Sequence, residues 1–429
     1  MPILAELSKR GQPVVLWFET TPPILIFSGL AFVGICLTLV SMGLHLDSVN
    51  FAAVGKRLGY LNEINWSVNF SFVVPVAAFF AFASLNNVSQ VVRNLSASKM
   101  LIREDGVALN DRDLLEHYHR MAGVAVFVGL LLSVLAFVVS WREWYVDCMF
   151  AWDPSRGVDG TKDLLMGWNL APTVPGSQAT LSANRVFGFC AFTMQAVAGA
   201  VFLLFCTMVV TFAAWIYHFT SEQVGDDLVP DVRSPDERRG FEHFEPFLRN
   251  ILFASLFFFG VFFLTRLNGA YVLSDSKTLW QFIRSDVFFG FASAQGGLFK
   301  NPSQLLYAGP DITKPIVTVG LGMGLTLVLA FLVPVVIVGL SASDSRSRAR
   351  VEPIRSILRE RANFTDEQFD KALDRMAIWP LKYPGPVELL SFLVVAGTCF
   401  VFYRLTLVLV GLVIAASLKR VVKILSGKV

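Results

Sequence analysis

Long apolar runs separated by polar connections dominate the chain. A helix needs about 20 consecutive apolar residues to cross the hydrocarbon core of a bilayer, and six stretches are long enough or nearly so. We therefore predict six transmembrane helices. They cover residues 23–45, 67–86, 121–140, 188–216, 249–266 and 316–340.

The polar connections and the two ends divide the protein further. Apolar positions recur at helical spacing in the segment after the sixth span, and Thr365 followed by Gln368 is a capping-box start, so a pair of helices is predicted there. The predicted units are an interfacial segment 1–22, the first three membrane helices 23–140 with a cytoplasmic loop 88–120, an extracytoplasmic loop 141–187, the fourth and fifth membrane helices 188–266, an extracytoplasmic segment 267–315, the sixth membrane helix 316–340, a basic cytoplasmic helix pair 341–386, and a C-terminal membrane segment with a basic tail 387–429.

The C-terminal apolar stretch, residues 388–418, is longer than one crossing requires. As a single helix it would be roughly 46 Å long, against a core of about 30 Å. A single span would leave the basic tail outside, whereas a re-entrant or surface hairpin would keep it inside, and both alternatives stay open. The predicted fold class is thus an all-α polytopic membrane protein. It has six transmembrane helices plus a C-terminal intramembrane helix or hairpin, with small extracytoplasmic and cytoplasmic subdomains.

The composition agrees with a membrane protein, and the distribution of Lys and Arg residues indicates its orientation in the membrane. The chain is 54% hydrophobic and 16% charged, whereas soluble domains carry about a quarter charged residues. With the N-terminus in the cytoplasm, the inner segments hold 20 Lys and Arg residues and the outer segments hold 11, as the positive-inside rule requires. We expect an integral protein of a bacterial plasma (inner) membrane. The net charge of +3 is too small to indicate nucleic acid as a partner.

Catalytic motifs are missing from the sequence. It contains no HExxH, P-loop, GxSxG or Gly-rich dinucleotide turn, so we expect a protein that is not an enzyme, without catalytic residues, metal or cofactor. His117 and His119 are two residues apart and point away from each other on a helix, which favours solvated positions. The predicted span interiors carry no acids or histidines, and this disfavours an ion-coupled transporter.

The stretch "DVFFGFASAQGGLF", residues 286–299, carries small and polar residues between two spans. Non-helical backbone at membrane depth occurs where it faces protein or water, and the following span is rich in glycine and bent by proline. This arrangement over residues 249–340 resembles the outer helix, pore loop and inner helix of tetrameric cation channels, although the potassium filter sequence is absent. The resemblance implies pore-lining residues Ser293, Gln295, Gly296 and Gly297, and gating hinges at Gly320, Gly322, Gly324 and Pro334.

Other interpretations of these segments stay open. Residues 267–315 also fit a small external subdomain, or an interfacial helix. Asn69 could line a wet cavity, but interhelical hydrogen bonding is favoured. Arg404 is an ionisable residue deep in an apolar run, which either lines a cavity or snorkels to the interface.

Basic and sulfur-containing side chains supply the remaining candidates. Cys148 and Cys190 flank the loop 141–187, and a disulfide between them is possible in an oxidising compartment. A cluster of arginines follows the sixth span, and attraction to anionic lipid headgroups explains it, with an acidic partner as the alternative. The cluster consists of Arg346, Arg348, Arg350, Arg355, Arg359 and Arg361.

Two function classes follow. The first is an oligomeric membrane channel, expected as a tetramer, because one chain supplies few polar residues to line a pore. A gated effector of stress or immune defence is one form that such a channel could take, with membrane lipids and a cytoplasmic regulatory protein as partners. The second is a membrane-embedded receptor or scaffold without a pore, which binds partners through its loops.

Overall fold

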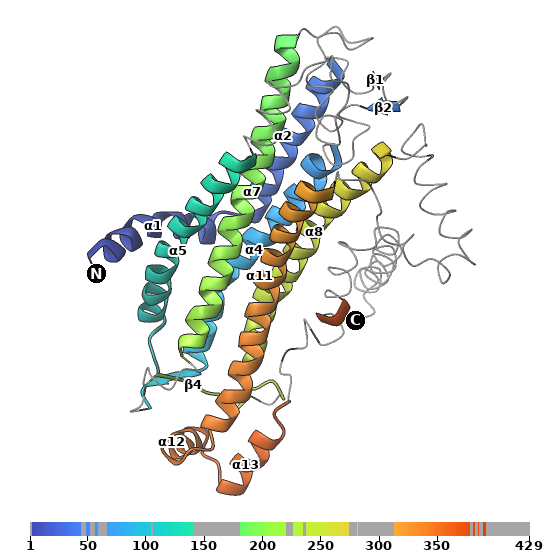
Figure 1. Cartoon of the computed structure of the whole chain (residues 1–429). Coiled ribbons are helices and arrows are strands. Elements are labelled where there is room, and N and C mark those ends of the chain that lie inside the picture. Colours follow the sequence, from blue (N-terminus) through green and yellow to red (C-terminus); the bar gives the residue numbers. More distant parts are fainter. Residues whose placement is uncertain are drawn as a thin grey trace, which may run out of the picture.

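The computed structural model is a mostly helical, elongated bundle (Figure 1). Helices are expected in a bilayer because a helix satisfies its backbone hydrogen bonds within itself. Among the described residues the exceptions are two short antiparallel strand pairs. The described residues are 2–43, 49–51, 56–58, 67–103, 106–140, 181–219, 226–234, 237–273, 281, 313–377, 381, 385 and 389–391.

The elements keep the order that the hydropathy pattern predicts, with extra short pieces between the long helices. They are α1 (Pro2–Thr20), α2 (Pro23–Gly43), β1 (Val49–Phe51), β2 (Lys56–Leu58), the π-helix η1 (Asn69–Val73), α4 (Val74–Ala97), β3 (Leu101–Arg103), α5 (Asp111–Ser140), α7 (Leu181–His218), β4 (Asp226–Leu228), the 3-10 helix η5 (Phe241–Phe244), α8 (Glu245–Leu273), α11 (Thr313–Arg348), α12 (Glu352–Ala362) and α13 (Asp366–Asp374).

Membrane-type helices are confirmed. All six predicted segments fall on helices, apart from residues 44 and 45, which lie outside the described residues. The segment 316–340 lies within α11, and a count of six spans stays a prediction. Five described segments are long and apolar enough to cross a membrane, namely Pro23–Gly43, Asn69–Ala97, Asp111–Val138, Ala196–His218 and Phe241–Val261.

Several helices run well beyond the predicted spans. The predicted loop 88–120 is largely helical, because α4 continues to Ala97 and α5 begins at Asp111. The helix α7 has 38 residues and α11 has 36, so each is roughly 55 Å long and exceeds a hydrocarbon core of ~30 Å. The bundle therefore extends past the thickness of a membrane.

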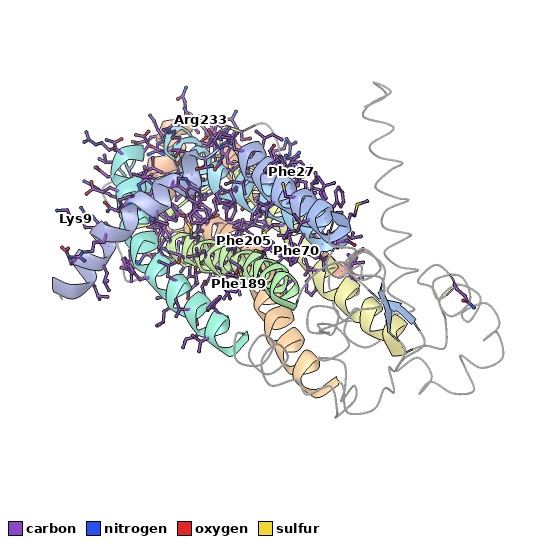
Figure 2. All side chains as sticks on the ribbon, turned by 90° about the horizontal axis from the view of Figure 1, so that it is seen from above. Lys9, Phe27, Phe70, Phe189, Phe205 and Arg233 are labelled. Carbon is purple, nitrogen blue, oxygen red and sulfur yellow. The ribbon has the colours of Figure 1, made fainter. Side chains whose placement is uncertain are left out.

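One apolar core holds the bundle together. Fully buried aromatic side chains come from several helices, among them Phe82 of α4, Phe205 of α7 and Phe247 of α8. Phe205 lies within the bundle, whereas Lys9 lies on its outside (Figure 2). On the outside of α2 and α5, large apolar side chains are exposed, as lipid-facing positions would be. They include Leu25, Phe32, Leu39, Leu131, Val134 and Val138.

Two helix crossings are unusually close. A Cβ atom on Gly11 of α1 would lie 2.0 Å from the carbonyl oxygen of Gly123 in α5, so glycine at both positions lets the backbones meet. A Cβ atom on Gly34 of α2 would lie 2.3 Å from the carbonyl oxygen of Phe70. The second contact falls on η1, where the helix widens just before Pro75, a residue with no N–H to donate.

A second, smaller core lies at one end of the bundle, where Figure 1 shows α12 and α13 beside β4. We call the group α12, α13, β3 and β4 the basal module. Leu101 of β3 pairs with Leu228 of β4, which joins the segments after α4 and α7. The buried side chains of this core are Ile102, Val229, Val232, Ala349, Leu358, Phe369 and Leu373.

Candidate functional site

The central stretch of the predicted pore loop cannot be compared with the structure. Ser293, Gln295, Gly296 and Gly297 lie outside the described residues, as do Arg404 and Cys148. Cys190 is a free, exposed cysteine on α7. The pore loop, the intramembrane arginine and the disulfide therefore stay predictions.

The predicted hinge residues all lie on α11. Gly320, Gly322 and Gly324 are in its first half, and Pro334 is inside the helix and buried. Proline interrupts the hydrogen bond to the preceding turn, yet α11 is one continuous helix from Thr313 to Arg348. It packs against both α7 and α8.

Asn69 is buried in η1 and contacts another helix. Its Nδ2 donates to the carbonyl oxygen of Val261 in α8, over a long 3.4 Å. This is the interhelical contact favoured for Asn69 from the sequence. The bond links η1 to the helix that precedes residues 274–312.

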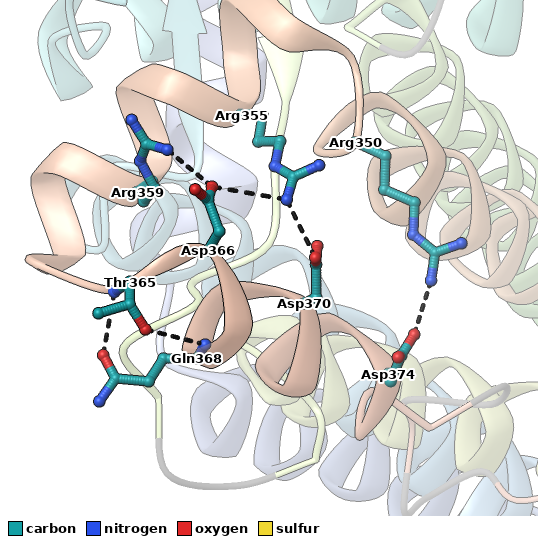
Figure 3. Close-up of polar contacts among 8 residues, drawn as sticks. All are labelled: Arg350, Arg355, Arg359, Thr365, Asp366, Gln368, Asp370 and Asp374. Atoms are coloured by element: carbon teal, nitrogen blue, oxygen red, sulfur yellow. Dashed lines mark hydrogen bonds and ion pairs between the residues drawn. The ribbon is translucent and has the colours of Figure 1, made fainter.

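The predicted arginine cluster is paired with acids in the basal module. Arg359 donates to Asp366 over 2.7 Å, and Arg355 reaches both Asp366 at 3.6 Å and Asp370 at 3.0 Å (Figure 3). The bond from Arg359 is the main reason why the pKa of the Asp366 carboxyl is lowered. These pairs join α12 to α13 along one helix face, because the acids are four residues apart.

The end of α11 is attached in the same way. Arg350 lies 2.7 Å and Arg346 3.6 Å from the carboxylate of Asp374. Arg348 forms an ion pair with Asp227 of β4, and both side chains are largely buried. The lower end of α11 is therefore fixed both to α13 and to the strand pair.

The sixth arginine of the cluster reaches the segment after α4. Arg361 donates to the carbonyl oxygens of Lys99 at 3.0 Å and Gly106 at 2.9 Å. Burial lowers the pKa of its guanidinium. All six arginines thus contact acids or carbonyls of the chain itself, a role that the sequence interpretation of lipid or partner contact did not include.

A buried polar junction, which sequence reasoning missed, lies where α1 meets α4 and α5. The Glu19 side chain is 4% exposed. Its Oε2 accepts from the Ser89 hydroxyl at 2.9 Å and lies 3.0 Å from Nε2 of His119. The expectation that His119 is a solvated histidine is wrong, because its side chain is 17% exposed and faces Glu19.

The surroundings of this junction are aromatic and incompletely hydrogen-bonded. Among the described residues, Glu19 Oε1, the Tyr118 hydroxyl and the Trp215 indole N–H are buried without a partner. The ring centroids of Tyr118 and Trp215 are 6.1 Å apart. Burying polar groups without partners is costly, so this junction carries an energetic cost that the surrounding apolar packing offsets.

The signal for this junction in the sequence is weak. Glu19 lies near the end of the predicted interfacial segment and His119 lies just before the third predicted span, and 100 residues separate them. Local periodicity gives no information about which helices meet. The described residues contain no cluster of His, Cys, Asp and Glu that could hold a metal ion.

Comparison with known proteins adds no relative. No protein-family model matches the sequence, and no curated protein or solved structure matches it.

Proposed function

We propose that this protein is an oligomeric membrane channel whose conducting unit consists of α8, residues 274–312 and α11. The observation that carries the proposal is the direct packing of α8 against α11. These helices bracket residues 274–312 in the sequence, so that segment connects two helices that pack against each other. The outer and inner helices of tetrameric cation channels flank a pore loop in the same order.

The second support is the continuity of α11. It runs without a break from Thr313, next to the proposed pore loop, to Arg348, which pairs with Asp227 in the basal module. A displacement of the basal module would therefore be transmitted along α11. Pro334 and the glycines before it are the proposed places where this helix bends during gating.

The packed core supports a pore between copies rather than within one copy. The interior of the described bundle is filled by large apolar side chains, such as Phe82, Phe202 and Phe212. Within the described part, one copy therefore offers little room for a polar path. We infer that the path lies between copies in a closed ring, proposed as a tetramer.

The orientation proposed is N-terminus and basal module in the cytoplasm of a bacterial cell. Three predicted inner segments, 88–120, 217–249 and 341–386, contribute β3, β4 and α12–α13, which pack together at one end (Figure 1). They hold most of the Lys and Arg residues of the predicted inner side. The positive-inside rule places such an end in the cytoplasm.

The packed core also favours a second function, that of a receptor or scaffold without a pore. Such a protein would bind partners through its outer loops or its basal module. It would not conduct ions, whatever its oligomeric state.

Flux measurements on liposomes containing the purified full chain separate the two functions. We expect ion flux that Gln295→Leu reduces at least about tenfold, because the amide is a proposed pore-lining group. The matched control is Gln90→Leu, which changes an exposed glutamine of α4 and should conduct like the wild type. Absence of flux from a folded, reconstituted wild-type protein would favour the receptor or scaffold.

A further inference from the structure

We propose that Glu19 and His119 form a proton-binding site that fastens α1 to the bundle when the imidazole is charged. The proposal concerns the docking of α1 and holds whether or not the protein conducts ions.

The first step is that α1 is docked by close contacts with both α4 and α5. Its Gly11 meets Gly123 of α5 backbone to backbone, and the Ser8 hydroxyl donates to the carbonyl oxygen of Arg120 at 2.9 Å. Near the other end of α1, the Val15 and Phe18 side chains are buried. The Glu19 side chain lies in the same interface, within hydrogen-bond distance of Ser89 and His119.

The second step is that the Glu19 site discriminates between charge states. The carboxylate is buried with one hydroxyl donor and one imidazole donor, and its Oε1 has no partner among the described residues. A charged donor strengthens a hydrogen bond to a carboxylate roughly twofold over a neutral one. Removing the proton from His119 would leave a buried carboxylate with neutral donors only, which is costly.

The third step is the sign of the effect. Proton binding to the imidazole and docking of α1 favour each other, because the charged pair exists only when α1 is docked. Docking should therefore be strongest at low pH within the range in which imidazoles titrate, about pH 5–8. It should weaken as the pH rises through that range.

The other charged or titratable groups near His119 are few among the described residues. On α5 these are Tyr118 and the exposed pair Glu116–Arg120. From α7, His218 faces His117 at a ring distance of 5.3 Å. The packed face of α4 contributes Ser89, which has no charge, and Arg93 one turn away, which is exposed.

Hydrogen–deuterium exchange of the full chain in lipid nanodiscs tests the proposal. Protection of the α1 amides, corrected for the chemical exchange rate at each pH, is compared between about pH 6 and about pH 8. We expect greater protection at the lower pH in the wild type, by more than the roughly twofold change that the variants below are allowed to retain. Amides of α8 serve as an internal reference for the intact bundle.

Two variants and one control make the test specific. Glu19→Gln and His119→Gln should each reduce the pH dependence to less than about twofold, because neither retains the charged pair. His117→Gln should keep it. If His119→Gln also loses protection in α8, the bundle itself is damaged, and the pH dependence of α1 protection in Glu19→Gln is then the test. Protection of α1 that does not depend on pH in the wild type, or a pH dependence that survives Glu19→Gln, would overturn the proposal.

Discussion

Replacing Gly11 by alanine should release α1 from the bundle. The added methyl group would lie 2.0 Å from the carbonyl oxygen of Gly123, whereas ordinary contact begins at 3.4 Å. The backbones must therefore separate by about 1.4 Å along that line, which is enough to forfeit a quarter to a half of the local dispersion energy.

The magnitude combines three terms. Overpacking against a rigid backbone costs about 3 kcal/mol. Loss of the hydrogen bond from Ser8 to Arg120, which spans the same crossing, costs about 1 kcal/mol. The higher helix propensity of alanine returns about 1 kcal/mol. The net destabilisation of α1 docking is about 3 kcal/mol, or roughly a hundredfold in its equilibrium.

The assay is amide exchange of α1 in the purified protein, with Gly29→Ala as the control. A Cβ atom on Gly29 of α2 meets nothing within 4 Å, so that variant should be neutral or slightly stabilised. Protection of α1 in Gly11→Ala equal to that in Gly29→Ala would refute the close crossing of α1 and α5.

Three further results are expected. The pKa of the Asp366 carboxyl is lowered chiefly by its bond from Arg359, so Asp366 stabilises the basal module above about pH 4 and this stabilisation is lost as the pH falls further. The amide protection of α13 should therefore fall on the acid side in the wild type and fall less in Asp366→Asn. The same pH profile in both proteins would contradict this. Thr365 closes a capping box on α13, so Thr365→Ala should lower the stability of that helix by about 1 kcal/mol, measured by the same exchange; no change would argue against the cap. In native protein that has first been reduced, so that any bond to Cys148 is open, the exposed thiol of Cys190 should react quickly with a maleimide, whereas that of Cys206 is buried and should react only after unfolding. Equal rates would contradict this.

The sequence was sufficient to predict the elements that depend on local pattern. Runs of apolar residues locate all six predicted segments on helices, and the spacing of Thr365 and Gln368 correctly predicts the start of α13. Helix lengths were less predictable. The turns of α4 and α5 beyond the predicted spans continue the helices, because Val88, Leu95 and Leu114 are also buried in the main apolar core.

Side-chain pairing between distant elements could not be predicted. Arg348 and Asp227 are 121 residues apart, and Glu19 and His119 are 100 apart. Both pairs depend on which helices and strands lie side by side, and hydrophobic periodicity contains no such information. The sequence pattern therefore assigns the arginine cluster to lipid headgroups and places His119 in solvent.

The most direct test of the proposed channel is ion flux through liposomes, measured together with the symmetry of the reconstituted particle. The proposal predicts a closed ring of copies that conducts ions, with flux abolished when residues 286–299 are replaced by a glycine-serine linker of equal length. A folded protein that remains monomeric and passes no ions would contradict it.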